Sequence, residues 1–347
     1  VTLGQKYRKI DKKTGKVSGG AFHYLKDGLN ERGFPNFGKA LAIVFAIFCI
    51  GGSLGGGNLF QANQTIKALT GTFLPLAEMQ VILSLLMTIS VGVVLIGGIK
   101  RIAKVAEKIV PFMAILYLFS GVVILAVNYQ NIIPGILFML EDAFTGAAAG
   151  GGIIGALIAG FRRATFSNEA GLGSAPIAHA CAKTKEPVRE GCVALLEPFL
   201  DTIVICFMTG LILTVTGVYE DKSIEAGVVM TNAAFATVSD WFPIFLSIAI
   251  MLFAYSTMMT WSYYGERAWA YLFSNKSVVI FQIIFCSVTF LGGIIDDINL
   301  IVDFSDLMLL SMAIPNLIGI YFMAPKIKRM VSEYRSKLEA GKFKVRN

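Results

Sequence analysis

The chain has 347 residues, of which 55% are hydrophobic and only 15% are charged, and its mean hydropathy is +0.69. Soluble domains carry about 25% charged residues, so the composition excludes an ordinary soluble protein and predicts several membrane spans. The five cysteines are scattered, which argues against a disulfide framework or a cysteine metal site.

In chain order, the sequence opens with a polar, basic segment at residues 1–38 and then shows apolar runs of bilayer length. The runs are long and continuous and lack the alternation of strands, so they predict helices. The eight predicted spans are 40–60, 76–99, 110–127, 150–180, 191–218, 242–264, 278–295 and 299–324. A transmembrane domain is therefore expected over 39–324, followed by a basic tail at 325–347.

Two polar segments between spans, 131–148 and 223–240, have amphipathic patterns. They are predicted to lie along the membrane surface, with plain connecting helices as the alternative.

The net charge of +7 could indicate nucleic-acid binding, but its distribution along the chain favours a membrane topology. If the eight spans alternate, 25 of the 30 Lys and Arg residues fall on one side, together with both chain ends, and two fall on the other. The positive-inside rule then places both ends in the cytoplasm, in a multi-pass protein of the cell membrane that binds no nucleic acid. This count requires the segment 150–180 to cross only once.

The stretch "TFSNEAGLGSAP", residues 165–176, places helix breakers and polar groups inside one of these spans. Irregular backbone in a membrane is tolerated only where it is packed in protein or lines a wet cavity. The residues expected to loosen the helix are Gly160, Gly171, Gly173 and Pro176, and those expected to cap its exposed ends are Ser167, Asn168 and Ser174.

We expect the first half-helix to end near Phe166 and the second to begin near Ser174. The two ends carry partial charges of opposite sign, which suits a zwitterion or a cation. The carbonyl groups of Thr165 and Phe166 are candidates to hold an ammonium group. The alternative is a glycine–proline kink that only packs.

Charged residues surround this break. Arg162 and Arg163 are expected to neutralise carboxylates rather than to bind a ligand, and the candidate partners are Glu169, Glu197 and Asp303. Glu197 and Asp201, four residues apart on a helix, are expected to pair with these arginines, with proton relay as a second possibility.

The segment "GGSLGGGNLFQANQ", residues 51–64, combines glycines spaced for close helix packing with several amides. Asn58, Gln61 and Thr65 fall on one face of a regular helix, and Gln64 lies beside them. This face could line a substrate cavity or form hydrogen bonds between helices.

Ser256 and Thr257 lie in the middle of the span 242–264 and could supply hard oxygen ligands to a small cation. Their alternative role is to bond carbonyls of their own helix. Trp261 follows by about one turn and could wall a pocket or simply pack.

Enzyme signatures such as GxSxG, HExxH or a Walker A loop do not occur in the sequence, and no nucleotide site is visible, so we do not expect an enzyme. A channel would need rings of ligands, usually from symmetric subunits, whereas one broken helix favours alternating access.

Four motifs carry a resemblance to a known family: "GFRRATFSNEAGLGSAPIAHA" (160–180), "FAYSTMMTWSYYGERAW" (253–269), "KYRKIDKKTGKVSGGAFHYLKDGL" (6–29) and "GGGNLFQANQ" (55–64). Together they resemble the alanine or glycine:cation symporter family, and the similarity covers the whole chain. The sequence departs from the family pattern at Ala21 and His23, where Pro and Tyr are expected, and at Thr260, where Gly is expected.

The resemblance implies an all-α membrane protein with a LeuT-like fold, built of two inverted five-helix repeats that each open with a broken helix. The broken span and the four after it make one repeat, and only three spans precede it. The first two helices of the first repeat are therefore expected to be missing from this chain.

The function implied is secondary active symport of Na⁺ with small neutral amino acids, L-alanine or glycine, by alternating access. An ion channel or a non-transporting membrane scaffold is the alternative. The implied Na⁺ ligands are Ser256, Thr257 and Thr260. The substrate-binding residues expected from the residues and the resemblance together are Phe166, Thr165, Ser167, Asn168, Trp261, Gln61, Gln64 and Asn58.

Overall fold

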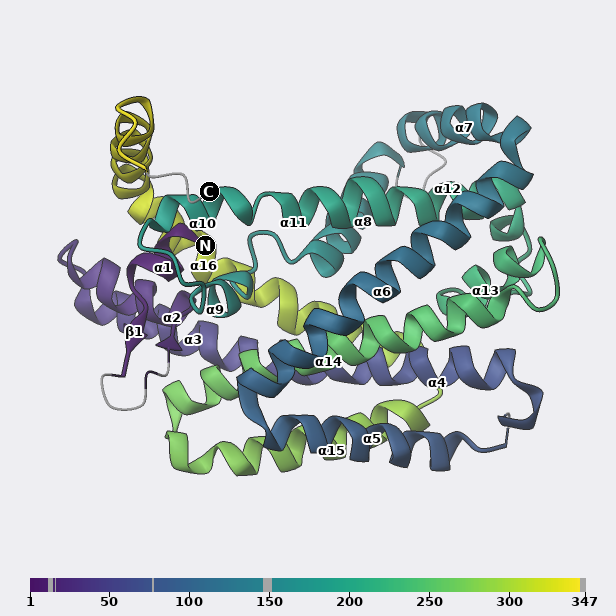
Figure 1. Ribbon diagram of the computed structural model, residues 1–347, viewed down its shortest axis with the longest axis horizontal. Helices are drawn as coiled ribbons and strands as arrows, with labels where there is room; N and C mark the ends of the chain where they lie inside the picture. The colour runs from purple at the N-terminus through teal and green to yellow at the C-terminus, as the bar shows by residue number, and fades with distance from the viewer. Residues whose placement is uncertain (12–14, 16, 77, 146–151, 344–347) are drawn as a thin grey trace.

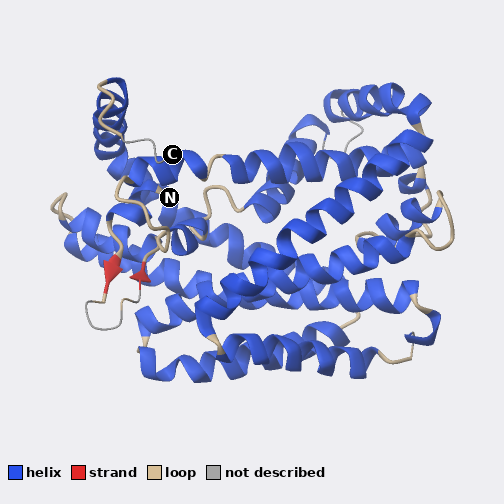
Figure 2. Cartoon of the chain, viewed as in Figure 1, coloured by secondary structure: helices blue, strands red, loops and turns tan. Residues whose placement is uncertain are grey.

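The computed structural model describes residues 1–11, 15, 17–76, 78–145 and 152–343. This part of the chain is almost entirely helical (Figure 2), and its two strands form one short antiparallel hairpin, β1 Lys9–Ile10 with β2 Val17–Ser18. It contains six helical stretches that are long and apolar enough to cross a membrane: Pro35–Thr72, Arg101–Val127, Pro187–Thr216, Pro243–Leu272, Asn275–Ile294 and Ile298–Glu339. The chain is therefore an all-α membrane protein with several spans.

The helices follow the predicted order along the chain (Figure 1). The first set comprises α1 Thr2–Lys6, α2 Ala21–His23, α3 Pro35–Leu54, α4 Phe60–Thr72, α5 Gln80–Ile96, α6 Gly98–Val127, α7 Ile132–Thr145 and α8 Gly152–Asn168. The second comprises α9 Ala175–His179, α10 Pro187–Val193, α11 Leu196–Pro198, α12 Phe207–Thr216, α13 Val228–Ala236, α14 Pro243–Leu272, α15 Val278–Ile294 and α16 Ile298–Glu339.

Short π-helical and 3₁₀-helical segments connect several of these helices. The π-helical turns are η1 Tyr24–Gly28, η2 Gly55–Leu59 and η6 Phe199–Cys206, and the 3₁₀ turns are η3 Leu74–Leu76, η4 Tyr129–Asn131, η7 Val218–Glu220 and η8 Asn275–Ser277. Because η2 connects α3 to α4 without a loop, residues 35–72 form one long helical stretch with a π turn in its middle.

Two of the eight predicted spans are not long continuous helices. The prediction at 76–99 corresponds to α5, an apolar helix of 17 residues. The prediction at 150–180 corresponds to α8, also of 17 residues, and the short helix α9, with an irregular segment between them. Residues 150 and 151 lie outside the described part. The amphipathic predictions are helical at α7 and α13, although residues 146–148 also lie outside it.

The centre of the protein is built by α3, α14 and α16, which pack closely because glycines line α3 and η2. A methyl group at Gly52 or Gly56 would lie 2.9 or 2.7 Å from Leu309 of α16, and one at Gly57 would overlap Trp261 of α14. The glycine spacing in residues 51–57 therefore serves close helix packing, as predicted.

The N-terminal segment is attached to the chain beyond the broken helix. The Arg8 guanidinium donates hydrogen bonds to the carbonyls of Ala180 (2.9 Å), Ala182 (2.6 Å) and Thr184 (2.9 Å), which follow the C-terminal end of α9. A cation suits this position because a helix C-terminus carries partial negative charge. This contact ties the N-terminal segment to the far end of the broken helix.

A second contact joins the N-terminal segment to α16. The Glu31 carboxylate accepts hydrogen bonds from Lys326 and from the Tyr7 hydroxyl, the latter at 2.7 Å. These bonds, with Lys326 as the larger cause, hold the pKa of the Glu31 carboxyl below its usual value. The helix α16 continues without interruption past residue 324 to Glu339, so the predicted last span and the start of the basic tail are one helix.

Candidate functional site

The break between α8 and α9 is formed by backbone that no regular helix can adopt. Glu169, Gly171 and Gly173 all have positive φ, at 56°, 83° and 96°. Glycine accepts this conformation readily, whereas for a residue such as Glu it costs about 1–3 kcal/mol and persists only when surrounding contacts enforce it. The helix ends at Asn168 and resumes at Ala175, within two residues of the predicted ends.

The Glu169 side chain supplies the contacts that hold this strained residue. One carboxylate oxygen accepts a hydrogen bond from the Trp261 indole N–H at 2.8 Å, and the other accepts one from the Ser174 hydroxyl. Trp261 lies on α14 and is buried, and Ser174 immediately precedes α9. Glu169 therefore ties both halves of the broken helix to α14.

The opposite side of the break is held by α16 and α3. The Asn316 amide of α16 donates to the Gly171 carbonyl at 2.7 Å and accepts from the Tyr24 hydroxyl. A methyl group at Gly173 would lie 2.8 Å from the Phe45 ring and 2.9 Å from Asn316 Cγ. Position 173 therefore needs glycine for two reasons, its positive φ and the close approach of these neighbours.

The two aromatic residues predicted to shape a pocket lie against neighbouring glycines of η2. A methyl group at Gly56 would lie 3.3 Å from the Phe166 ring, and Trp261 covers Gly57. The Phe166 ring also packs edge-on against Phe60, with ring centroids 5.2 Å apart. The structure thus brings Phe166 and Trp261 to the same short stretch of backbone, beside the break.

Gln61 belongs to this group as well, because its side-chain amide donates to the Gly56 carbonyl at 3.0 Å. Of the two carbonyls predicted to face a ligand, that of Thr165 accepts a hydrogen bond from the Glu169 N–H at 3.1 Å. In a continuous helix the Ala170 N–H would bond the Phe166 carbonyl, but it donates instead to the Asn168 side chain at 2.8 Å. The Thr165 hydroxyl bonds the Phe161 carbonyl of its own helix.

The side chains of Ser167 and Asn168 bond residues of η6. The Ser167 hydroxyl donates to the Asp201 carboxylate at 2.7 Å, and the Asn168 amide donates to the Thr202 hydroxyl at 2.8 Å. Both partners lie on η6. The prediction that Ser167 and Ser174 cap helix ends is wrong, because their hydroxyls are directed to carboxylates, whereas Asn168 does receive a backbone N–H.

The amides of the first long helix do not share one face. Asn58 donates to the Phe285 carbonyl at 2.7 Å and accepts from Thr289 at 2.8 Å, so it faces α15. Gln64 accepts from the Val228 N–H of α13 at 3.1 Å. The π turn at η2 changes the helical spacing assumed from the sequence, and these two amides form the interhelical hydrogen bonds that were the alternative prediction. Thr65 bonds the Gln61 carbonyl of its own helix.

The arginines before the break pair with a carboxylate that sequence reasoning missed. Arg162, at 2.6 Å, and Arg163 both donate to one oxygen of Asp306 on α16. The predicted partners Glu169, Glu197 and Asp303 were wrong for these arginines. Asp306 is nearly buried within an apolar run, which was a usable signal, since charged residues inside spans usually pair.

Glu197 and Asp201, the acidic pair predicted to bind these arginines, have other neighbours. Glu197 is 3.4 Å from the His179 ring, and His179 also contacts Glu190 at 2.7 Å. Asp201 receives the Ser167 hydroxyl, as described above. Asn316, Tyr24 and Ser174 also hold the break, and of these only Ser174 was considered from the sequence.

The candidate cation ligands lie along α14. The Ser256 hydroxyl is buried and donates to the Phe253 carbonyl at 2.8 Å, and the Thr260 hydroxyl donates to the Ser256 carbonyl at 3.0 Å. Both hydroxyls make the bonds within their own helix that were the alternative prediction for such residues. A hydroxyl that donates its proton in this way keeps its acceptor lone pairs, so it can still bind a cation.

Comparison with known proteins covers the whole chain. Residues 1–347 match the model of the sodium:alanine symporter family. The sodium/alanine symporter AgcS of Methanococcus maripaludis is 38% identical over 348 residues, which cover 99% of this chain and 74% of the relative. The probable sodium/glutamine symporter GlnT of Bacillus subtilis is 33% identical over 348 residues, covering 99% and 70%. The amino-acid carrier protein AlsT of the same organism is 30% identical over 356 residues, covering 100% and 72%.

The role of Glu169 can be tested by stability. Glu169→Ala leaves the Trp261 N–H and the Ser174 hydroxyl without their acceptor, which should cost about 1.5–3 kcal/mol and lower the apparent melting temperature in detergent. Glu169→Gln can still accept from Trp261 and can donate to Ser174, so it should melt closer to the parent. Glu220→Ala, at an exposed position on η7, is the control. Equal melting of all four proteins would show that the carboxylate does not hold the break.

Proposed function

Because the chain belongs to the sodium:alanine symporter family, we propose that it couples the entry of Na⁺ to the uptake of a small neutral amino acid, L-alanine or glycine. Membership makes the chain a membrane transporter with Na⁺ as its coupling ion. The observation that carries the proposal is the break between α8 and α9, which places polar groups and free helix ends among long apolar helices. The energy for uptake comes from the Na⁺ gradient.

The break also supports a LeuT-like arrangement of repeats. Four long apolar stretches follow it: Pro187–Thr216, Pro243–Leu272, Asn275–Ile294 and Ile298–Glu339. Counted with the broken helix they make a five-helix unit that opens with a discontinuous helix, which is the organisation of transporters with inverted repeats. In such proteins the substrate lies at the discontinuity, near the middle of the membrane.

The substrate ammonium group is proposed to lie at the C-terminal end of α8, at the Phe166 carbonyl. This end carries partial negative charge, and the side chain of Asn168 has taken over the N–H that would otherwise bond this carbonyl. The substrate carboxylate then goes to a helix N-terminus, beside a cation. Phe166 and Trp261 narrow the space for the substrate side chain, and Glu169 fixes the plane of the Trp261 indole.

The Na⁺ ion is proposed to bind on α14, with Ser256, Thr257 and Thr260 as oxygen ligands. Hydroxyl and carbonyl oxygens are hard ligands that suit a small cation. The Ser256 carbonyl accepts the hydrogen bond of the Thr260 hydroxyl, so these two residues are held next to each other on α14.

The topology that we propose for the protein follows from its positive charge. Both described ends carry Lys and Arg in excess, and the positive-inside rule assigns them to the cytoplasmic face of the cell membrane. The segment 1–38 and the tail after 324 then lie on the side where the amino acid is released.

Uptake into proteoliposomes tests the function. Labelled L-alanine should accumulate above its equilibrium level when an inward Na⁺ gradient is imposed, and the accumulation should collapse when the gradient is dissipated. Vesicles with equal Na⁺ on both sides and protein-free vesicles are the controls. Alanine flux that ignores Na⁺ would indicate a channel-like path, and the lack of any flux would indicate a non-transporting scaffold; either result would contradict the proposal.

The size of the pocket can be tested separately. Trp261→Ala or Phe166→Ala should broaden selectivity toward valine and leucine, because an extra methylene in a filled pocket costs roughly 1–3 kcal/mol and the substitution removes that cost. The measurement is competition of labelled alanine uptake by neutral amino acids of increasing size. Trp241→Ala, at an exposed tryptophan, and Phe138→Ala are matched controls. An unchanged size cutoff in variants that still transport would place the pocket elsewhere.

The Na⁺ ligands can be tested with a double variant. Ser256→Ala with Thr257→Val should raise the Na⁺ concentration for half-maximal uptake by about tenfold, which corresponds to ~1.4 kcal/mol of lost binding free energy. Ser120→Ala with Thr214→Val is the control, because both hydroxyls bond their own helices in other spans. If the first pair shows the Na⁺ dependence of the control pair, these hydroxyls do not bind the ion.

A further inference from the structure

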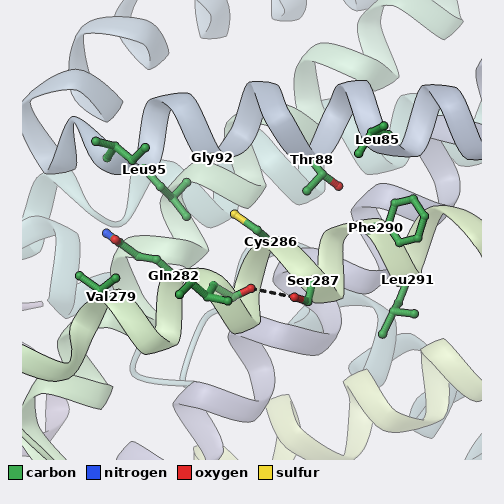
Figure 3. Close-up of a pocket in the computed structure, with 12 residues that line it drawn as sticks. Leu85, Thr88, Gly92, Leu95, Val279, Gln282, Cys286, Ser287, Phe290 and Leu291 are labelled. Atoms are coloured by element: carbon green, nitrogen blue, oxygen red, sulfur yellow. Dashed lines mark hydrogen bonds between the residues drawn. The ribbon is translucent and has the colours of Figure 1, made fainter.

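A long apolar groove lies on the outside of the protein, far in sequence from the broken helix. It has a volume of about 640 Å³ and runs between α5 and α15, which lie side by side along one edge of the molecule (Figure 1). Leu95 and Val279 line one end, Gly92 and Cys286 the middle, and Leu85 and Phe290 the other end (Figure 3). The two helices are thus antiparallel along the groove.

Gly92 of α5 leaves space in the middle of the groove. A methyl group at Gly92 would lie 3.4 Å from the Cys286 sulfur, so a larger side chain there would occupy the groove. Its two hydroxyl residues bond carbonyls of their own helices: Thr88 donates to the Ser84 carbonyl at 2.8 Å, and Ser287 to the Ile283 carbonyl at 3.0 Å. The walls therefore present mainly hydrocarbon to the membrane.

The two ends of the groove differ in charge. At the Leu95–Val279 end, Arg101 folds back along α5 and donates to the Val93 carbonyl at 2.8 Å, and Lys276 lies exposed three residues before Val279. At the Phe290 end, the charged residues that flank the two helices are acidic: Glu78 precedes α5, and Asp296 and Asp297 follow α15. The lysine at this end, Lys67, donates to the Asp296 carbonyl at 3.3 Å and is paired with the Glu225 carboxylate. The Gln80 amide donates to the Gly293 carbonyl at 3.0 Å, which holds these two acidic segments together.

We propose that this groove binds an anionic phospholipid, with one acyl chain between α5 and α15 and the phosphate at Arg101 and Lys276. An acyl chain matches the elongated, apolar shape of the groove, and the cations match a negative headgroup. The acidic opposite end fixes the direction of the lipid, because a phosphate there would meet carboxylates. The headgroup position also coincides with the ends of both helices, which is the depth of the membrane interface.

The lipid bridges two helices that belong to different parts of the chain, so its binding is expected to stabilise the α5–α15 pair. This inference is independent of the proposed substrate site, and its test does not require transport.

Native mass spectrometry of the purified protein is the test, with equal amounts of palmitoyl-oleoyl phosphatidylglycerol and phosphatidylcholine as probes. The parent should retain phosphatidylglycerol in preference. Gly92→Phe fills the groove and should reduce this retention roughly tenfold, whereas Val93→Phe, on the next residue and outside the groove lining, should not. Arg101→Gln with Lys276→Gln should abolish the preference for the anionic lipid, and Lys222→Gln with Arg335→Gln is the matched control.

A second measurement keeps the proposal testable if Gly92→Phe does not fold. With Cys181, Cys192 and Cys206 changed to Ser, maleimide labelling reports on Cys286 in the groove, since Cys49 is buried. Phosphatidylglycerol vesicles should slow this labelling more than phosphatidylcholine vesicles. The proposal is overturned if both lipids protect Cys286 equally, if the two Phe variants retain lipid alike, or if the groove is covered by a second copy of the chain, seen as a dimer that Gly92→Phe dissociates.

Discussion

The bond between the Glu169 carboxylate and the Trp261 indole is the contact on which the candidate site depends. A residue with positive φ inside a membrane helix is costly, and the freed backbone groups need partners because hydrocarbon offers none. Glu169 meets the first demand, because its two oxygens receive the Trp261 indole N–H of α14 and the Ser174 hydroxyl at the start of α9. The side chains of Asn168 and Asn316 meet the second, because they bond the Ala170 N–H and the Gly171 carbonyl. The break is therefore a fixed feature of the fold, and the orientation of Trp261 follows from it.

The glycines of η2 leave room for large side chains beside the break. Since Gly56 and Gly57 carry no side chains, the Phe166 and Trp261 rings can approach the backbone of the first long helix from α8 and α14. Asn316 and Gly173 close the break from the other side, against α16 and α3. The helices α3, α14 and α16, which are distant in sequence, therefore all contact the break between α8 and α9. A change at the break can reach all three for this reason.

Local patterns predicted the break well, whereas its partners depended on tertiary structure. The glycines and Pro176 located the irregular segment to within two residues, because backbone conformation is set by the residues themselves. Asp306 and Asp303 lie one turn apart on α16, and only the packing of α8 decides that the arginines pair with Asp306. For Asn58 the sequence left a cavity-lining role and interhelical hydrogen bonds equally open. The structure shows the hydrogen bonds, because Asn58 lies within the π turn at η2, which alters the regular helical spacing.

The measurement that tests this account most directly is a double-mutant cycle on alanine affinity, with calorimetry in saturating Na⁺. The variants are Glu169→Ala, Trp261→Phe and the two combined, since Phe keeps the ring but lacks the indole N–H. If Glu169 shapes the amino-acid site through Trp261, the double variant should lose about 0.5–3 kcal/mol less binding free energy than the two single losses added together. Additive losses would show that the two residues act independently and would contradict the account.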